Sequence, residues 1–389
     1  MSKKNVLIYG ATGSIGDSTL NLIRNNKEKF NVVGLTCNKN IQKLIKVSHE
    51  FNCKNIGIGN KELIEKHKDI FLDFNTYGGI SDFYSLVTEN DVDIIIFAIS
   101  GTSPLKLLMQ LAGSGKTIGL VNKECIICLG KLFLDKANIS STKIVPLDSE
   151  HNAIYQLINK RNLNSIKHYT ITASGGNFYN YSYPDLKKIT PQQAIKHPKW
   201  TMGEKITIDS STLMNKGLEI IEACILFDIN KDNIDTLIHP EAIVHGLIEF
   251  NDSTQHGFLS QPNMEISISS VLFKENNVDL NRFHLDLKKI KSLNFYEVDN
   301  KKFRAIDLAK KSLEYGGLAP TILNYSNELM VNIFLQNKIL FTDIVINCEK
   351  IMEQFVVEGN NKDDYSLDDI YQSFSVIDEY VNQHQLIID

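Results

Sequence analysis

The sequence has little that would hold it in a membrane. Its longest uninterrupted apolar run, from Ile94 to Ile99, has only six residues, whereas a membrane-spanning helix needs about 20 apolar residues. The N-terminal stretch MSKKNVLIYG enters a predicted strand after four residues, so we expect no signal or transit peptide. Both observations predict a cytoplasmic protein without a membrane partner.

Cysteine is scarce as well. Six cysteines are spread over 389 residues, at positions 37, 53, 125, 128, 224 and 348. This usage is typical of reduced thiols in a cytoplasm and not of a disulfide framework. Cys125 and Cys128 form a lone CxxC pair without a second Cys or His pair nearby. A redox or zinc role is one interpretation of this pair, but buried helix thiols explain it more simply.

The chain also has no large excess of charge of either sign. Lys and Arg number 41 against 46 Asp and Glu, which gives a net charge of −5. This mild acidity argues against nucleic acid as the main partner, although a local basic site for a small anion remains compatible with it. Hydrophobic residues make up 43%, which is ample for packed cores. At roughly 150 residues per domain, the length predicts two or three domains.

Apolar strands alternate with helical patterns in the first 148 residues. The predicted strands are 6–9, 32–36, 55–58, 94–99, 117–121 and 143–147, and the amphipathic stretches between them include 14–25, 41–51 and 104–111. Several strands are apolar at every position, as expected of strands covered on both faces. The alternation predicts an α/β domain over 1–148 with a doubly wound, Rossmann-type parallel sheet.

The rest of the chain has a different character. Gly, Ser, Thr, His and Trp concentrate in 149–275, which we interpret as an α+β catalytic domain with a lid loop near 197–205. Residues 276–300 are charged and mixed, and we expect a linker there. The pattern in 301–389 is helical, which indicates an all-α C-terminal bundle. Its predicted helices are 305–315, 319–336, 341–356 and 367–383.

A glycine-rich loop, GATGSIG at 10–16, follows the first predicted strand and opens a helix. Its glycines permit a tight turn and let backbone N–H groups approach a pyrophosphate at the helix N-terminus. The spacing GxxGxxG only approximates the dinucleotide fingerprint GxGxxG, and an ordinary glycine-rich turn is the alternative. The position between a strand and a helix favours dinucleotide binding.

The end of the second predicted strand bears on the choice of dinucleotide. NAD-specific sites place an Asp or Glu there to hold the ribose 2′-hydroxyl. Here the residues are Asn38, Lys39 and Asn40, without an acid and with a cation. Since a cation at this point neutralises a 2′-phosphate, NADP is favoured over NAD. A solvated surface side chain is the alternative interpretation of Lys39.

Two carboxylates stand close together after the last strand of the first domain, in the sequence PLDSEH at 146–151. Asp148 and Glu150 are two residues apart, so in an extended segment they point the same way. Such a pair at a strand's carboxyl end is suited to a hard divalent cation such as Mg²⁺ or Mn²⁺. The alternative is a solvated acidic turn or a helix cap.

A second polar cluster occupies residues 209–222. On a helix, Asn215, Glu219 and Glu222 share one face, and Lys216 flanks Glu219. Ser210, Asn215 and Lys216 offer the hydroxyl, amide and ammonium donors that a phosphate needs. Glu219 is a candidate third oxygen ligand for the metal. A solvated helix face is the alternative interpretation, but the small polar residues around it make that interpretation weaker.

Two further stretches are candidates for the same site. The turn at 172–176, TASGG, is able to present the Ser174 hydroxyl and N–H groups to an anion. The stretch HPKWTMG at 197–203 carries Trp200, the only Trp of the chain. A lid that closes over substrate fits this stretch, and a surface loop with its Trp tucked into the core is the alternative.

Taken in order, these motifs resemble the 1-deoxy-D-xylulose 5-phosphate reductoisomerase family. The motifs are GATGSIG at 10–16, LVNKE at 120–124, PLDSEH at 146–151, ASGG at 173–176, HPKWTMGEKITIDSSTLMNKGLE at 197–219 and HPEAIVHGLIEF at 239–250. The resemblance implies a homodimer that uses NADPH and one divalent cation, Mg²⁺ or Mn²⁺. The implied reaction is rearrangement and reduction of 1-deoxy-D-xylulose 5-phosphate to 2-C-methyl-D-erythritol 4-phosphate in the non-mevalonate isoprenoid precursor pathway.

The resemblance also implies a role for each matching residue. The implied metal ligands are Asp148, Glu150 and Glu219, and Lys123 is the further catalytic residue. The implied substrate contacts are Lys123, Ser149, Glu150, Ser174, His197, Ser210, Asn215, Lys216 and Glu219, with Trp200 and Met202 on the lid. The implied NADPH contacts are Thr12, Gly13, Ser14, Ile15, Asn38, Lys39, Asn40, Asn122, Glu124 and Gly203.

The chain departs from the family pattern at two places, and two rival functions remain. Asn38 stands where the family usually has Gly, and Asn tolerates a left-handed backbone. Glu265 replaces a basic residue in SQPNMEISI at 260–268, where a Pro is also lost. One rival is a metal-independent NADP dehydrogenase of the semialdehyde type, which needs a nucleophilic Cys or a lone His/Lys pair. The other is a non-catalytic NADP-binding protein.

Overall fold

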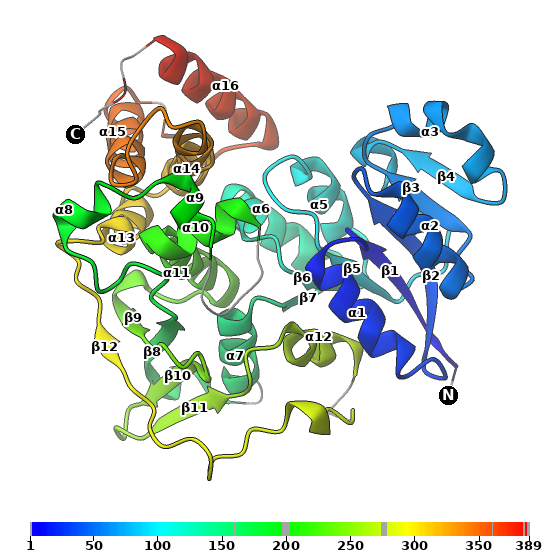
Figure 1. The fold of residues 1–389 in the computed structure, drawn as a ribbon, viewed down its shortest axis with the longest axis horizontal. Helices are drawn as coiled ribbons and strands as arrows, with labels where there is room; N and C mark the ends of the chain where they lie inside the picture. The colour runs from blue at the N-terminus through cyan, green and yellow to red at the C-terminus, as the bar shows by residue number, and fades with distance from the viewer. Residues whose placement is uncertain are drawn as a thin grey trace. The chain divides into compact units, whose positions relative to one another are not determined.

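The computed structural model describes residues 2–158, 161–196, 203–273, 278–359, 361–383 and 386. Its contacts divide the chain into two compact units. Figure 1 shows the helices and strands of both in chain order. Unit 1 comprises Met1–Cys125, Lys131–Tyr155 and Pro262–His284, and unit 2 comprises Ile126–Gly130, Gln156–Gln261 and Leu285–Asp389. The domain boundaries predicted at residues 148, 275 and 300 were based on the expected function of each segment, and they stay predictions.

Unit 1 is built on a seven-stranded parallel sheet with the strand order β4-β3-β2-β1-β5-β6-β7. The strands are β1 Lys4–Tyr9, β2 Phe30–Cys37, β3 Asn55–Ile58, β4 Asn75–Gly78, β5 Ile94–Phe97, β6 Thr117–Leu120 and β7 Lys143–Pro146. The helices are α1 Ser14–Arg24, α2 Ile41–Glu50, α3 Glu62–Lys66, α4 Ser85–Thr88, α5 Leu105–Ala112, α6 Lys123–Ile139, α7 Ser149–Ile158 and α12 Met264–Leu272. Within them, residues 126–130 of α6 and 156–158 of α7 belong to unit 2. All four residues of β5 are buried, as a strand covered on both faces requires. The predicted doubly wound α/β sheet is confirmed.

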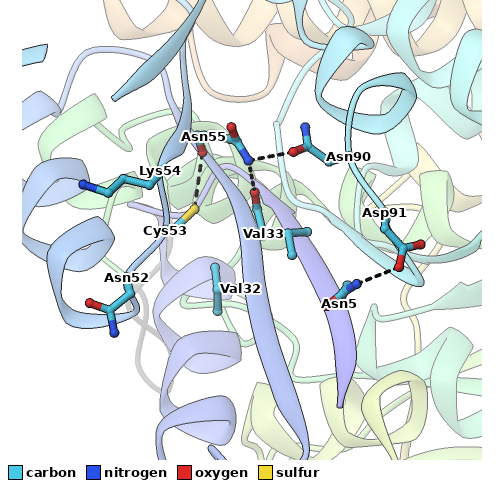
Figure 2. Close-up of a pocket in the computed structure, with 9 residues that line it drawn as sticks. All are labelled: Asn5, Val32, Val33, Asn52, Cys53, Lys54, Asn55, Asn90 and Asp91. Atoms are coloured by element: carbon cyan, nitrogen blue, oxygen red, sulfur yellow. Dashed lines mark hydrogen bonds between the residues drawn. The ribbon is translucent and has the colours of Figure 1, made fainter. Parts of the chain in front are cut away.

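Polar side chains tie together the amino ends of the strands of this sheet (Figure 2). Asn55 donates hydrogen bonds to the carbonyl of Val33 at 2.9 Å and to Oδ1 of Asn90 at 2.7 Å, and Asn5 donates to Asp91 at 3.1 Å. The pocket that these residues line lies at the edge opposite to the carboxyl ends of the strands. Ligands of open α/β sheets bind at the carboxyl ends, so we interpret the pocket as structural.

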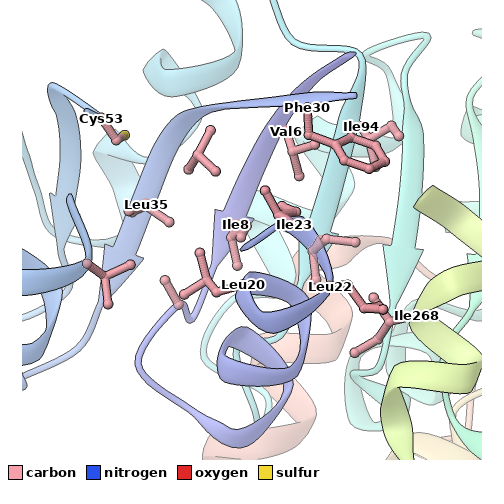
Figure 3. Packing of buried hydrophobic residues seen from close by; sticks show 14 of the residues in the cluster. Val6, Ile8, Leu20, Leu22, Ile23, Phe30, Leu35, Cys53, Ile94 and Ile268 are labelled. Carbon is pink, nitrogen blue, oxygen red and sulfur yellow. The ribbon is translucent and has the colours of Figure 1, made fainter. Parts of the chain in front are cut away.

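One face of the sheet is covered by helices from distant parts of the sequence. Val6 and Ile8 of β1 pack with Leu20 and Ile23 of α1, and Ile268 of α12 joins the same cluster (Figure 3). All five side chains are at most 1% exposed, and burying each contributes roughly 2 kcal/mol to folding. Helix α12 therefore packs with unit 1, although the preceding hundred or so residues of chain belong mainly to unit 2.

The strand β4 was not among the predicted strands. Its sequence NTYG contains only one buried side chain, Tyr77. It stands at the edge of the sheet beside β3, where one row of backbone groups faces away from the ladder and an apolar run is not needed. An edge strand of this kind gives no hydrophobic signal in the sequence.

Unit 2 combines a five-stranded sheet with helices. The strand order is β11-β10-β8-β9-β12, with β8 and β9 parallel and the other pairs antiparallel. The strands are β8 Ile166–Ala173, β9 Ile234–Ile238, β10 Val244–Phe250, β11 Gln255–Leu259 and β12 Tyr296–Glu297. The helices are α8 Tyr183–Leu186, α9 Pro191–Ala194, α10 Glu204–Thr212, α11 Met214–Phe227, α13 Ala305–Tyr315, α14 Ala319–Leu335, α15 Asp343–Val357 and α16 Leu367–Gln383. The α+β character and the helical C-terminal region are confirmed, and the four C-terminal helices agree with the predicted ranges within two residues.

The six cysteines are free thiols. Cys125 Sγ donates to the carbonyl of Gly101 at 3.4 Å, whereas Cys128 Sγ accepts from Asn324 at 3.4 Å. The two sulfur atoms of the CxxC pair thus have separate partners, which supports the interpretation as buried helix thiols. Among the described residues, no helix combines the length and the hydropathy that a bilayer crossing demands.

Candidate functional site

The glycine-rich loop lies between β1 and α1, at the point where the strand order of the parallel sheet reverses. Gly10 has φ +83, and a Cβ there would lie 2.4 Å from the carbonyl oxygen of Ala98. Only glycine permits this approach of β1 to the end of β5. Gly13 is the N-cap of α1 and has no side chain to cap the helix. The first N–H groups of α1, from Ser14 on, therefore form an open helix N-terminus of the kind that binds phosphate.

Lys43 supports this loop, and the sequence analysis missed it. Its ammonium donates to the carbonyl oxygen of Thr12 at 3.0 Å and forms an ion pair with Asp17. Lys43 stands in the first turn of α2, and its backbone N–H donates to the N-cap side chain of Asn40 at 3.1 Å. The loop after β1 is thereby connected to the loop after β2. A lysine three residues after an Asn is too common a pattern to signal this contact.

Asn38, Lys39 and Asn40 follow β2 at the same carboxyl edge of the sheet, and all three are exposed. Asn38 does not have a positive φ; its carbonyl accepts a hydrogen bond from the N–H of Asn60 at 3.1 Å. The turn therefore has no need of the left-handed conformation for which the family's usual glycine would be suited. Lys39 presents a cation at this edge, and no acid lies among the three residues.

The carboxyl ends of β6 and β7 hold a second polar group of residues. Lys123 begins α6 directly after β6, and its ammonium lies 2.6 Å from Oδ2 of Asp148, which follows β7. The side chains are 6% and 16% exposed. The carboxylate oxygens of Asp148 and Glu150 lie within 4.8 Å of each other, and Ser149 Oγ donates a hydrogen bond to Glu150. The unit thus brings an ammonium and two carboxylates together at one edge of the sheet.

Asn122 and Glu124 flank this lysine. The Asn122 amide donates to the carbonyls of Ile99 at 2.6 Å and Gly101 at 2.8 Å, and its oxygen accepts from the N–H of Cys125 at 2.6 Å. Its side chain therefore fixes the loop after β5 and caps α6. Glu124 is half-buried in the first turn of α6. Direct contact of either residue with a dinucleotide stays a prediction.

In unit 2, the residues predicted to bind phosphate lie where α10 ends and α11 begins. Ser210 is in the last turn of α10, and Leu213, with φ 59, separates the two helices. Asn215 and Lys216 stand in the first turn of α11, and both donate hydrogen bonds to the carboxylate of Glu219 one turn later. The Lys216 and Glu219 side chains are 4% and 1% exposed. A pair buried this deeply is not the solvated helix face that was the alternative.

The glycine-rich turn after β8 lies against the end of α10. A Cβ on Gly176 would be 2.8 Å from Cα of Ser211 and 2.9 Å from the carbonyl oxygen of Ser210. The backbone of this turn is therefore in close contact with the residue that carries one of the predicted donors. Ser174, two residues earlier, is half-buried, and its Oγ accepts from the N–H of Gly176 at 3.4 Å. The unit brings the Ser174 turn and Ser210 together, as the phosphate prediction requires.

The predicted lid is only partly visible. His197, Trp200 and Met202 lie outside the described residues. Gly203, predicted to contact the dinucleotide, is the exposed N-cap of α10. Whether Gly203 contacts the dinucleotide or belongs to a lid stays a prediction.

The Glu265 departure has a local explanation in unit 1. Asn263 caps α12 by accepting a hydrogen bond from the N–H of Glu265 at 2.8 Å. Glu265, in the first turn of that helix, forms an ion pair with Arg282. An acid is favourable near a helix N-terminus, and Arg282 supplies the positive charge that residue 265 itself lacks. The start of α12 therefore accommodates Glu265 through the Asn263 cap and the ion pair with Arg282.

Comparison with known proteins relates the whole chain to one family. A curated protein of Sulfurihydrogenibium sp. (strain YO3AOP1), named 1-deoxy-D-xylulose 5-phosphate reductoisomerase, is 41% identical over 376 residues, which is 96% of each chain. The chain belongs to the 1-deoxy-D-xylulose 5-phosphate reductoisomerase family. A reductoisomerase of Clostridium perfringens (strain 13 / Type A) is 39% identical over 356 residues, covering 90% of this chain and 93% of its own. The predicted family and the prediction of an enzyme are confirmed.

Models of reductoisomerase domains match three segments of the chain. The general 1-deoxy-D-xylulose 5-phosphate reductoisomerase model matches residues 6–130. Two models described as reductoisomerase C-terminal domains match 144–227 and 259–377. Five of the six sequence motifs that carry the resemblance fall within these ranges, and the sixth, at 239–250, lies between the second and the third.

Solved reductoisomerase structures have the same fold. One, described as a complex with NADPH, fosmidomycin and magnesium, has a TM-score of 0.90 at 33% identity and covers 97% of both chains. The reductoisomerase of Zymomonas mobilis in complex with NADPH has a TM-score of 0.88 at 33% identity, with 96% of this chain and 97% of that chain covered. Together they confirm the fold class.

Proposed function

We propose that this protein converts 1-deoxy-D-xylulose 5-phosphate to 2-C-methyl-D-erythritol 4-phosphate with NADPH and a divalent cation, as a step of the non-mevalonate isoprenoid precursor pathway. The observation that carries the proposal is the relationship to a reductoisomerase over 96% of both chains. Unit 1 also contains the proposed nucleotide loop and two proposed metal ligands, and unit 2 contains the proposed phosphate donors and the third ligand. A homodimer is expected from the resemblance and stays a prediction.

NADPH is the proposed nucleotide. The loop of residues 10–16 stands at the strand-order reversal, where doubly wound sheets bind dinucleotides. Lys39 supplies a cation after β2, which favours a 2′-phosphate over a free hydroxyl. Two related structures are complexes with NADPH. The proposed contacts are Thr12, Gly13, Ser14, Ile15, Asn38, Lys39, Asn40, Asn122, Glu124 and Gly203.

Asp148 and Glu150 of unit 1 and Glu219 of unit 2 are the proposed metal ligands. All three offer hard carboxylate oxygens, which Mg²⁺ and Mn²⁺ prefer, and the oxygens of the first two lie within 4.8 Å of each other. A related structure is a complex with magnesium. When bound, the cation supplies polarisation of substrate oxygens and the nucleotide supplies hydride.

The substrate phosphate is assigned to donors of unit 2. Ser174, Ser210, Asn215 and Lys216 provide two hydroxyls, an amide and an ammonium group near the junction of α10 and α11. Charge-assisted hydrogen bonds of this kind hold phosphate strongly. Because the phosphate is remote from the reacting carbons, its binding energy is available to position them. Ser149 and His197 are the remaining proposed substrate contacts, with Trp200 and Met202 on the lid.

Lys123 is the proposed proton donor of the site. Its ammonium is fixed 2.6 Å from Asp148 and is almost completely buried. Both stages of the reaction change the charge on substrate oxygens, and the second creates a hydroxyl group that needs a proton. An ammonium group held beside the proposed ligand pair is placed to donate a hydrogen bond or that proton.

The semialdehyde-type dehydrogenase is less favoured because the chain offers no reactive thiol. In the form that uses a nucleophilic Cys, such an enzyme attacks its substrate with a thiolate, which requires an accessible Cys with a lowered pKa. Five of the six cysteines are buried, and Cys224 is half-buried. Burial raises the pKa of Cys224 to about 12, so the thiol stays protonated at neutral pH.

The experiment that tests the function is an absorbance assay of NADPH oxidation with 1-deoxy-D-xylulose 5-phosphate. We expect turnover with Mg²⁺ or Mn²⁺, loss of turnover after chelation by EDTA, and recovery when the cation is returned in excess. Oxidation that EDTA does not affect would favour the dehydrogenase. NADPH binding without any oxidation would favour the non-catalytic protein.

A substitution of Lys39 tests the proposed choice of NADPH. Lys39→Ala is expected to raise the KM for NADPH about tenfold, the effect of losing one exposed charge-assisted contact with a phosphate. The KM for NADH should not change, because NADH has no 2′-phosphate. Lys46→Ala is the matched control, since Lys46 is also an exposed lysine, and it lies on α2. Equal effects of the two substitutions would show a general charge effect instead.

A further inference from the structure

Asp209 is a buried carboxylate directly before the predicted phosphate ligand Ser210. It is 2% exposed, and both of its oxygens have partners. Lys205, one turn earlier on α10, places its ammonium 2.7 Å from Oδ2. Asn327 of α14 donates a hydrogen bond to Oδ1 at 2.8 Å. The first partner is on the same helix, whereas the second is 118 residues away in the sequence.

The surroundings of Asp209 come from three helices of unit 2. Asn327 is completely buried, so its amide is fixed by the packing of α14. Burial raises the pKa of the Cys348 thiol on α15, and the negative charge of Asp209 raises it further, which places Asp209 near α15 as well. Removing a partner from a buried charge leaves that charge uncompensated, which is strongly destabilising. Moving the Asp209 carboxylate away from its two partners would therefore be unfavourable.

The backbone around Asp209 is part of the junction that carries the phosphate donors. The Thr212 hydroxyl donates to the carbonyl oxygen of Asp209 at 3.2 Å, and the N–H of Leu213 donates to that of Ser210 at 3.3 Å. The turn at Gly176 is in close contact with the backbone of Ser210. A displacement of Asp209 would therefore move Ser210 and change the start of α11.

We propose that Asp209 is a positioning residue for phosphate binding, held by Lys205 and by Asn327 of α14. This inference rests on the proposed function. Asp209 itself makes no contact with the substrate; it fixes the last turn of α10, and through it Ser210 and the first turn of α11. Helix α14 of the C-terminal region thereby takes part in substrate binding through Asn327, which lies outside the family motifs described above.

The test removes the distant partner and leaves the donors untouched. Asn327→Leu keeps a side chain of similar size but loses the hydrogen bond to Asp209. We expect the KM for 1-deoxy-D-xylulose 5-phosphate to rise about tenfold, with the KM for NADPH within about twofold of wild type. Purely structural damage lowers the concentration of active enzyme, which reduces the apparent kcat and leaves both KM values unchanged.

Asn324→Leu is the matched control. Asn324 stands three residues earlier on the same helix and is also completely buried, but its amide faces Cys128. We expect thermal destabilisation similar to that of Asn327→Leu without a rise in the KM for substrate. Wild-type enzyme without turnover would refute the proposed function alone, whereas active wild type with an equal KM in Asn327→Leu would refute only the role of Asp209. A rise in KM that Asn324→Leu reproduces would also refute that role.

If Asn327→Leu does not fold, the role of Asp209 can be tested by exchanging the carboxylate and the amide between positions 209 and 327. Asn327→Asp places two carboxylates together and should raise the KM for substrate at least as much as Asn327→Leu. The double variant Asp209→Asn with Asn327→Asp restores one carboxylate and one amide at the contact, so part of the lost affinity should return. A double variant no better than Asn327→Asp alone would overturn the inference.

Discussion

Glu219→Gln is expected to lower kcat about 10³-fold while leaving the affinity for NADPH within about twofold of wild type. Gln has nearly the shape of Glu but no negative charge, and a neutral amide oxygen is a poorer ligand for Mg²⁺ or Mn²⁺. The side chain is only 1% exposed, so water cannot take its place easily. The nucleotide loop belongs to unit 1, whereas Glu219 belongs to unit 2. The measurements are steady-state turnover and NADPH binding by fluorescence titration.

A neighbouring acid provides the control for this prediction. Glu222, one turn further along α11, is completely buried as well and is not a proposed ligand. Glu222→Gln should therefore retain a turnover within about tenfold of wild type. Glu219→Gln should also need a higher concentration of Mg²⁺ for its residual activity, which a loss of packing alone does not cause. The reverse result, with Glu222→Gln the inactive variant, would assign the ligand to Glu222.

Loss of the Glu219 charge also affects Lys216, and this effect is separable. The Lys216 ammonium pairs with Glu219 and is nearly buried, so Gln leaves an uncompensated charge in a poorly solvated place. Any resulting destabilisation appears in thermal unfolding. If activity is lost because a metal ligand is missing, the residual turnover rises with the concentration of the cation. If activity is lost because the protein unfolds around Lys216, the loss is seen as a lower unfolding temperature.

The sequence predicts the parallel sheet well because its signal is local. A strand that helices cover on both faces must be apolar at every position, and β5 meets this condition with four buried residues. The edge strand β4 has no such signal, because polar side chains suffice where one edge is unpaired. Helix α12 was not among the predicted helices, and its sequence also does not indicate which of the two units it packs with.

The candidate site divides in the same way between local and distant information. Asp148 and Glu150, or Asn215 and Glu219, are recognisable because they stand close together in the sequence with a fixed spacing. The bond from Asn327 to Asp209 joins residues 118 positions apart. Neither residue differs, as a residue type, from many others in the chain. Contacts of this kind depend on the packing of helices, and one sequence contains no periodic signal for them.

Gly176→Ala should raise the KM for 1-deoxy-D-xylulose 5-phosphate at least about tenfold and lower the free energy of unfolding by about 3 kcal/mol. Gly176 has φ +63, a conformation that costs an alanine roughly 1 kcal/mol. The added Cβ would also meet backbone atoms of Ser210 and Ser211 at 2.9 and 2.8 Å. Backbone atoms at the end of a helix do not move aside as a flexible side chain does. The turn and Ser210 must therefore separate, and the phosphate donors lose their spacing.

Gly359→Ala separates these two costs. Gly359 has φ +75, but a Cβ there would meet nothing within 4 Å, so alanine incurs only the conformational cost of roughly 1 kcal/mol. We expect a small decrease in the free energy of unfolding, measured by urea denaturation, and unchanged KM values. The difference between the two variants then measures the contact of the Gly176 turn with α10. If the two variants were equally stable and had the same KM for substrate, this contact would not hold the phosphate donors in place, and Ser174 and Ser210 would have to be assigned to separate roles.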